Sequence, residues 1–469
     1  MHAPATTDVA TIDTLPDALA SPARPEPQAT AEEVQPHWNL ATRVGFRFSF
    51  LYFSSYVVLT QMVGGLLPFE WLPNVGATTF VQRIISWVGA HVFRLAGPLS
   101  FQTTGSGDKM VDYLQVFTLL VAAALATAVW SVVDRRRPNY RGLDKWFRVF
   151  LRFSVGSTML SYGMVKAIPM QMPAPGLQRL LEPFGNFSPM GALWYSIGAS
   201  KSYEMFGGFM ELTAGVLLFV PRLATLGAMV TFATTVQIFT LNMTYDVPVK
   251  LFSFHLIVMS LVLIAPEASR LANVVVFNRA AGPSAQPALF RRRSLALMAL
   301  AIQLGYGAFL VMQGYAGAHQ TWFQRGGGAP KSALYGIWNI ETMTIDGQVR
   351  SPLVTDYGRW RRVLFQSPTG VTFQRMDDTF LPYGAKIDTA AKTIAVTAAP
   401  NPPGAPSTPP ASSPPASIFK YQRPDAERLI LDGSLDGHAI HMETRLFDRN
   451  NFLLVSRGFN WIQERPFNR

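Results

Sequence analysis

The stretch MVDYLQVFTLLVAAALATAVWSVV, residues 110–133, decides the fold class, because Asp112 is its only charged side chain. A run of about 20 apolar residues is long enough to cross the hydrocarbon core of a bilayer as one helix. Three arginines, at positions 135–137, follow almost at once. Lys and Arg beside a span favour the cytoplasmic side. The stretch therefore predicts a membrane helix whose C-terminal end faces the cytoplasm.

Further apolar runs on both sides of this stretch have a comparable length. The spans that we expect lie near 44–68, 110–133, 146–168, 204–221, 223–242, 249–267 and 294–313. The segment 79–97 is short and carries two arginines and a histidine, which indicates a helix lying in the interface. The segment 171–200 is rich in Pro, Gly and aromatic residues. It predicts an ordered loop with a short interfacial helix around Leu177–Leu181.

The composition excludes several classes of protein. Only 15% of the residues are charged, against about 25% in soluble domains. The absence of cysteine excludes disulfides, thiolate-bound zinc, iron–sulfur clusters and a cysteine nucleophile. Residues 1–36 hold six acidic residues and one arginine, so they predict a disordered tail and not a signal peptide.

The basic residues behind the net charge of +11 are placed asymmetrically between the expected spans. This bias puts the N-terminus in the cytoplasm and everything after the last span outside it. It also argues against nucleic acid as a partner, since these bases orient helices instead of lining a groove. The bases on the expected inner side are Arg135, Arg136, Arg137, Arg141, Lys145, Arg148, Arg222, Arg270, Arg279, Arg291, Arg292 and Arg293.

Residues 314–469 alternate between apolar and polar residues in short segments, which predicts a small antiparallel barrel or sandwich. Turn signals stand at Asp346-Gly347, Asp432-Gly433 and Asp436-Gly437. The run 398–417 is rich in proline and predicts a flexible insertion. Gly336-Ile337-Trp338 resembles the Gly-x-Trp start of lipocalins. The expected strands are 336–347, 360–367, 370–376, 392–398, 418–422, 428–435, 438–448 and 452–458.

Polar residues inside membrane spans are costly and normally face a bundle interior or a water-filled cavity. Glu204 and Glu211 are seven apart and share a helix face, and Gly207 and Gly208 between them permit close helix packing. We expect Glu204 to be solvated at the membrane boundary. Glu211 is the deepest carboxylate and is expected to pair with Lys166. The polar residues expected in the outer half are Tyr162, Lys166, Glu211, Asn242, Tyr245, Asp246, Lys250 and His255.

Structural roles compete with a site role for these residues. Lys166 and Lys250 could be anchors whose side chains reach the interface. Asp246 could pair with Lys250 or cap the entry to the next span. His255 could be a satisfied interior histidine. His438 and His441 would point to opposite faces of a strand, so no metal site is expected.

The residues from about Arg141 to Leu271 resemble the DoxX/DoxD-like membrane proteins, which are four-helix units. The resemblance rests on Tyr162-Gly163-x-x-Lys166, on Phe206-Gly207-Gly208-x-x-Glu211 and on Asn242-x-x-Tyr245-Asp246 followed by Lys250. It implies a four-helix membrane unit in a bacterial cytoplasmic (inner) membrane. The three other expected spans and the outer β domain lie beyond this unit, so the chain resembles an enlarged member. Members similar to DoxD are the membrane subunit of thiosulfate:quinone oxidoreductase. A related fold, that of the vitamin-K-dependent carboxylases, uses a lysine base on a quinol.

The expected parts of the chain are a tail (1–40), two helices with an interfacial segment (41–140), the DoxX-like unit (141–272), a basic linker (273–293), a seventh helix (294–313) and the β domain (314–469). Three functions compete. The first is a membrane redox component that binds a quinone or sulfur compound, with partner subunits. The second is a membrane-anchored binding or assembly protein. The third, a transporter of small solutes or lipid carriers, ranks last because the sequence shows no inverted repeats.

In the first hypothesis the catalytic residues are Lys166, Glu211 and His255. The ligand-binding residues are Tyr162, Asn242, Tyr245, Asp246 and Lys250.

Overall fold

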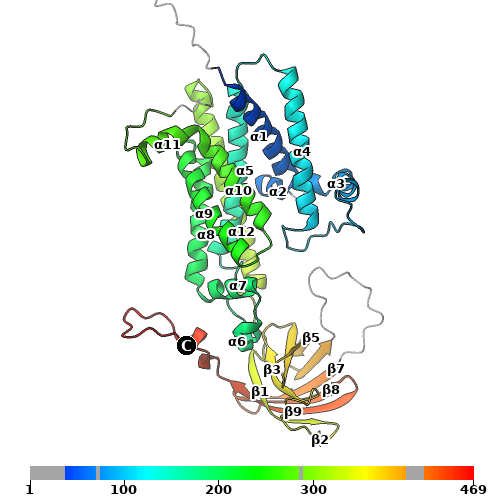
Figure 1. Cartoon of the computed structure of the whole chain (residues 1–469). Helices are drawn as coiled ribbons and strands as arrows, with labels where there is room; N and C mark the ends of the chain where they lie inside the picture. The colour runs from blue at the N-terminus through cyan, green and yellow to red at the C-terminus, as the bar shows by residue number, and fades with distance from the viewer. Residues whose placement is uncertain (1–36, 70–73, 285–288, 398–416, 469) are drawn as a thin grey trace, which may run out of the picture.

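The computed structural model describes residues 37–69, 74–284, 289–397 and 417–468. Figure 1 shows a bundle of long helices with a β-barrel beyond one of its ends. Of the expected tail and proline-rich insertion, residues 1–36 and 398–416 lie outside the described residues.

The helices start where the sequence offers capping groups. Asn39 accepts a hydrogen bond from the backbone N–H of Thr42, and Ser188 followed by Pro189 caps a later helix. The helices are α1 (Leu40–Leu59), α2 (Met62–Leu66), α3 (Thr79–His91), α4 (Met110–Val133), α5 (Arg141–Ala167), α6 (Leu177–Leu181), α7 (Pro189–Ala199), α8 (Lys201–Phe219), α9 (Ala224–Thr244), α10 (Lys250–Ile264), α11 (Ala268–Val275), α12 (Arg293–Arg325) and α13 (Leu453–Ser456).

Four helical stretches are long and apolar enough to cross a membrane: Met110–Val133, Pro221–Thr244, Lys250–Val275 and Arg293–Arg325. The chain is therefore a membrane protein with a helical part and a β domain. The other expected spans correspond to α1 with α2, to α5 and to α8, which pack among the apolar helices in the same bundle. Their crossing stays a prediction. Figure 1 shows α3 nearly end-on beside α4, so it runs across the long axis of the bundle.

Two expected helix boundaries are wrong. The expected span 44–68 is interrupted, because α1 ends at Leu59 and Thr60 is extended. The side chain of Gln115 donates a hydrogen bond of 2.7 Å to the carbonyl oxygen of Leu59 and so satisfies a group at this helix end. The last span was expected to end at residue 313, but α12 continues to Arg325. Helix formation itself does not require an apolar surface, and this helix ends at three successive glycines, 326–328.

Helices α5 and α8 touch through their backbones. A Cβ atom added at Gly163 would lie 2.7 Å from the backbone nitrogen of Leu212, and one added at Gly208 would lie 2.2 Å from that of Ala167. Nothing lies within 4 Å of such an atom at Gly207. Of the two glycines expected to permit close packing, Gly208 therefore carries the contact.

The β domain is a closed antiparallel barrel. Its strands follow one another in chain order, and β9 returns to pair with β1, while the two-residue β2 only extends the hairpin at the end of β1. Because the sheet closes on itself, the barrel is confirmed and the alternative of a two-sheet sandwich is excluded. The strands are β1 (Gly336–Ile345), β2 (Gln348–Val349), β3 (Trp360–Phe365), β4 (Gly370–Arg375), β5 (Phe380–Asp388), β6 (Thr393–Thr397), β7 (Ser417–Gln422), β8 (Arg428–Leu435) and β9 (His438–Phe447).

Large apolar side chains fill the barrel. Trp338, Phe373 and Met442 belong to one buried cluster that includes residues from every strand except β2. The indole N–H of Trp338 donates a hydrogen bond of 2.9 Å to the carbonyl oxygen of Leu334, and the guanidinium of Arg423 lies over the indole ring. The interior is therefore a packed core.

Seven of the eight expected strands form. The segment 452–458 is wrong, because it contains the short helix α13; a closed barrel leaves no free edge for another strand. Strand β5 was not expected, since Pro382 and Gly384 interrupt its pattern. The turn expected at Asp432-Gly433 is also wrong, because both residues lie inside β8. A Cβ at Gly433 would lie 2.7 Å from the Cα of Phe419, so this glycine allows β7 to approach.

The short helix expected at Leu177–Leu181 forms with those bounds, as α6, and it contacts the barrel. Leu177 packs with Ile337 and Leu364, and its backbone N–H donates a hydrogen bond of 2.8 Å to the Gln366 side chain. Figure 1 shows α6 between the bundle and the barrel. The loop between α5 and α8 is thus tied to the β domain.

The glycine contact predicts that Gly208→Ala lowers the melting temperature of the purified chain in detergent. The new methyl group meets the α5 backbone, and overpacking of this kind costs about 1–3 kcal/mol. Gly207→Ala is the matched control and is expected to leave the melting temperature unchanged, because its Cβ meets open space. Equal losses in both variants would contradict the packing role of Gly208.

Candidate functional site

A cavity of about 320 Å³ lies among α5, α7, α8, α9 and α10. Its walls are mainly apolar, with Met159, Leu193 and Phe252 among them. Several polar residues also line it. They include Tyr162, Lys166, Gln171, Glu204, Glu211, Gln237 and Asn242. Four of the eight residues predicted from the sequence, Tyr162, Lys166, Glu211 and Asn242, therefore meet at one cavity.

Lys166 and Glu211 form a buried ion pair. The Nζ atom of Lys166 lies 2.6 Å from Oε1 and 2.8 Å from Oε2 of Glu211. The glutamate side chain is 2% exposed and the lysine side chain 11%. The close backbone contact at Gly163 and Gly208 brings the two helices near enough for this pairing. The pair is neutral as a whole, so it can exist in surroundings of low dielectric constant where either charge alone would be costly.

Tyr162 lines both the first cavity and a second one of about 330 Å³, as do Val249 and Phe252. Its ring lies 5.8 Å from the Nζ atom of Lys166, and its hydroxyl accepts a hydrogen bond of 3.2 Å from Gln61. Asn242 donates hydrogen bonds to the Val249 carbonyl oxygen and to the Ser253 hydroxyl. Asn242 therefore holds the turn between α9 and α10 as well as lining the first cavity.

Glu204 is the residue that the sequence reasoning misjudged. It was expected to be solvated, but it is 2% exposed and lines the cavity. Its Oε1 atom accepts a hydrogen bond of 2.8 Å from the backbone N–H of Met172. Among the described residues, its Oε2 atom and the Oε1 atom of Gln171 are buried and have no hydrogen-bond partner. The cavity wall therefore contains two acceptors that lack donors.

His255 lies apart from this cavity. Its ring stacks on Tyr56 at 4.0 Å between centroids, its Nε2 atom is 2.6 Å from the Tyr52 hydroxyl, and its Nδ1 atom is 2.7 Å from the Leu251 carbonyl oxygen. A carbonyl only accepts, so Nδ1 carries the proton and Nε2 accepts from Tyr52. His255 thus has the contacts of a satisfied interior histidine.

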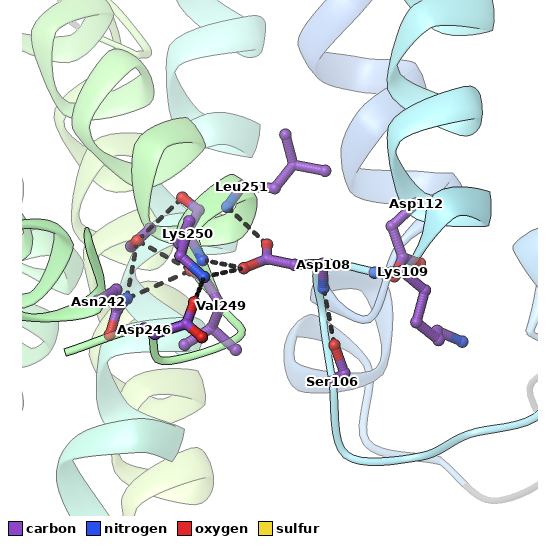
Figure 2. Close-up of polar contacts among 10 residues, drawn as sticks. Ser106, Asp108, Lys109, Asp112, Asn242, Asp246, Val249, Lys250 and Leu251 are labelled. Carbon is purple, nitrogen blue, oxygen red and sulfur yellow. Dashed lines mark hydrogen bonds and ion pairs between the residues drawn. The ribbon is translucent and has the colours of Figure 1, made fainter. Parts of the chain in front are cut away.

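Asp246 and Lys250 form the second expected ion pair, with 2.9 Å between Oδ1 and Nζ (Figure 2). Both residues, together with the exposed Tyr245, are outside the lining of the 320 Å³ cavity. Asp246 is 83% exposed, and its φ of 52° places it in the left-handed turn between α9 and α10. This pair belongs to the connection of the two helices.

Asp108 caps α10 from a distant part of the chain. Its two oxygens accept hydrogen bonds of 2.9 Å from the backbone N–H groups of Lys250 and Leu251, and Oδ2 lies 3.7 Å from the Nζ atom of Lys250 (Figure 2). The sequence reasoning missed this residue. Its local signal, a position just before α4, carries no information about a helix 142 residues away.

Among the described residues, no group of three or more His, Asp or Glu side chains is placed to hold a metal ion. His438 contacts Asp346 and His441 contacts Asp432. The hydrogen bond from His438, with a second from the Ala439 backbone, holds the pKa of Asp346 below its usual value. The first contact connects the β1–β2 and β8–β9 hairpins, and the second joins the two strands of the β8–β9 hairpin.

The uncharacterized protein YwoB of Bacillus subtilis (strain 168) is similar to this chain. The two are 31% identical over 138 residues, which are 28% of this chain and 79% of YwoB. No protein-family model matches the chain, and no solved structure matches it.

Removing one partner of the Lys166–Glu211 pair is expected to destabilise the protein by about 3–5 kcal/mol, because the other charge stays buried and unpaired. We expect Lys166→Met and Glu211→Gln to lower the melting temperature strongly, and the double variant to recover much of the loss. Thermal unfolding of the four proteins gives the coupling between the two residues. Losses that simply add would contradict the pairing.

The cap on α10 predicts that Asp108→Ala lowers stability by about 0.5–2 kcal/mol, because two backbone N–H groups lose their acceptor. Asp246→Ala removes only an exposed partner and is expected to cost at most about 1 kcal/mol. Chemical unfolding of both variants makes the comparison. A larger effect at Asp246 would show that the ion pair, and not the cap, holds this connection.

Proposed function

We propose a function for this chain from its cavity. The chain belongs to the same family as the uncharacterized Bacillus subtilis protein YwoB, whose name gives no activity. The protein binds a quinone-like small molecule among its helices, as the membrane component of a quinone-linked or sulfur-linked redox system. The observation that carries this proposal is a mainly apolar cavity that contains an ion pair and two buried acceptors without donors.

The size and walls of the cavity suit the body of such a ligand. Its volume of about 320 Å³ lies within the ~300–1,000 Å³ typical of small-molecule sites. Met159, Leu193, Trp194 and Phe252 offer apolar and aromatic surface for a ring. The helices around it cross or adjoin an apolar phase, from which a hydrophobic ligand can enter.

The polar groups suit the head of the ligand. A quinol has two hydroxyl donors, which match the unpartnered oxygens of Glu204 and Gln171. An unsatisfied buried acceptor costs about 1–3 kcal/mol, so a ligand hydroxyl that pairs with it gains that amount. Lys166 has three N–H groups and donates two hydrogen bonds to Glu211, so the third N–H can donate to a quinone oxygen.

A redox role also requires groups that transfer the protons and electrons of the bound quinone or quinol. Oxidation of a quinol to a quinone releases two electrons and two protons. Glu204, and Glu211 together with Lys166, are the groups at the cavity that can accept or return the protons. The electrons pass to or from a partner subunit or a sulfur compound. The resemblance to DoxX/DoxD-like proteins supports this part of the proposal.

The second candidate is a non-catalytic assembly protein. It is favoured by the mutual satisfaction of Lys166 and Glu211 and by the docking of α6 on the barrel. Because the barrel interior is filled, a partner would bind its outer surface.

We also propose that the membrane is the inner membrane of a bacterium, with the barrel outside the cytoplasm. Figure 1 places α11 and the barrel at opposite ends of the bundle. The connections around α11 and the start of α5 carry 11 of the 22 Lys and Arg residues between positions 37 and 313. The positive-inside rule then places this basic end in the cytoplasm.

Quinone that copurifies from bacterial membranes tests the binding. We expect wild type to carry bound quinone and Glu204→Gln to carry about tenfold less, since the new amide turns the free acceptor into a donor while Oε1 still accepts from Met172. Asp246→Asn, outside the cavity, is the control and should carry as much as wild type. Extraction and mass spectrometry give the amounts. No quinone in wild type, or equal loss in the control, would contradict the proposal.

Quinone reduction by membranes, with thiosulfate as donor, tests the redox role separately. We expect activity above that of membranes lacking the protein, and its loss in Glu204→Gln. Bound quinone without such activity would favour the assembly role.

A further inference from the structure

A third cavity lies at the opposite, basic end of the bundle, with a volume of about 500 Å³. Five basic residues line it: Lys145, Arg148, Arg152, Arg222 and Arg270. They come from α5, from the connection between α8 and α9, and from α11. Among the described residues of its lining, none is acidic. The described lining of the cavity therefore carries five basic side chains and no acidic side chain to balance their charge.

The nearby carboxylates neutralise only part of this charge. Asp144 accepts a hydrogen bond of 2.8 Å from the Nε atom of Arg148, and Glu267 pairs with Arg270. Among the described residues, the Nη1 atom of Arg148 and the Nε atom of Arg152 are buried and have no acceptor. Guanidinium groups stay charged, so these N–H groups cannot be satisfied by losing a proton. Two buried donors on successive turns of α5 thus lack a partner.

The basic side chains are held in place by other contacts. Lys145 donates a hydrogen bond of 2.7 Å to the Leu289 carbonyl oxygen, and Arg270 donates one of 2.8 Å to that of Gly282. Arg152 also donates to the side chain of Gln303 on α12. These contacts with Leu289, Gly282 and Gln303 hold three of the bases in place, which lowers the cost of ordering them around a ligand.

We propose that this cavity binds a phosphate group, either the headgroup of an anionic phospholipid or a free phosphate compound. Phosphate oxygens accept several charge-assisted hydrogen bonds, and the planar guanidinium donates two in parallel. The cavity lies where α9 starts and α10 ends, at the end of helices long enough to cross a membrane. Basic pockets between helices at this depth suit lipid phosphates. The inference does not rest on the quinone proposal.

The full-length chain in neutral detergent tests this inference with two probes. In one arm, phosphatidylglycerol is compared with phosphatidylcholine by native mass spectrometry of retained lipid. In the other, inorganic phosphate is compared with chloride at equal ionic strength by the shift in melting temperature. We expect Arg152→Gln to weaken binding about tenfold, the effect of losing one charge-assisted hydrogen bond. Arg136→Gln, exposed at the same end and outside the lining, should bind as wild type does.

Each outcome decides between the sources or rejects both. Retention of phosphatidylglycerol that falls in Arg152→Gln, with no effect of inorganic phosphate, identifies a lipid headgroup. Stabilisation by inorganic phosphate without a lipid preference identifies a free phosphate compound. No preference in either arm, or an equal loss in Arg136→Gln, overturns the proposal. If Arg152→Gln does not fold, Arg222→Gln replaces it, because Arg222 is an exposed residue of the lining.

Discussion

The backbones of α5 and α8 are so close at Gly163 and Gly208 that no side chain fits between them, and the polar chemistry of the bundle depends on this contact. A carboxylate and an ammonium group can both stay charged in an apolar interior only when they meet at hydrogen-bond distance. The contact brings Lys166 and Glu211 to 2.6 Å and leaves the space beside them as a cavity. A wider separation of the two helices would leave two isolated charges there.

The two ends of the bundle handle charge in different ways. At the end near the barrel, Lys166 is matched by Glu211, and Lys250 is matched by Asp246 and Asp108. Among the described residues at this end, the buried Oε2 atom of Glu204 and the Oε1 atom of Gln171 lack hydrogen-bond donors. At the basic end, five cations line one cavity and buried guanidinium N–H groups lack acceptors. One end thus suits an uncharged ligand with hydroxyl groups, and the other suits an anion.

In the β domain, the local alternation of apolar and polar residues predicts most of the strands but not all of them. Alternation and two Asp-Gly turns were enough to predict most strands, because each hairpin depends on residues close in sequence. Strand β5 was not predicted because Pro382 and Gly384 break the alternation of apolar and polar residues. The strand still pairs with β4 and β6, since this pairing does not depend on the alternation. The segment 452–458 has a strand-like pattern, but the pairing of β9 with β1 had already closed the barrel. A strand needs a free neighbour as well as a pattern.

The sequence by itself determined where most helices and strands lie, which end of the bundle is basic and that Glu211 needs a cation. These properties follow from hydrophobic period and from charge, which act between near neighbours. Only the tertiary structure decided that Glu204 is buried beneath the Met172 backbone, that Asp108 caps α10 and that His255 faces Tyr52 and Tyr56. The solvation of a polar atom depends on which distant segments close over it, and that arrangement is a property of the whole packed chain.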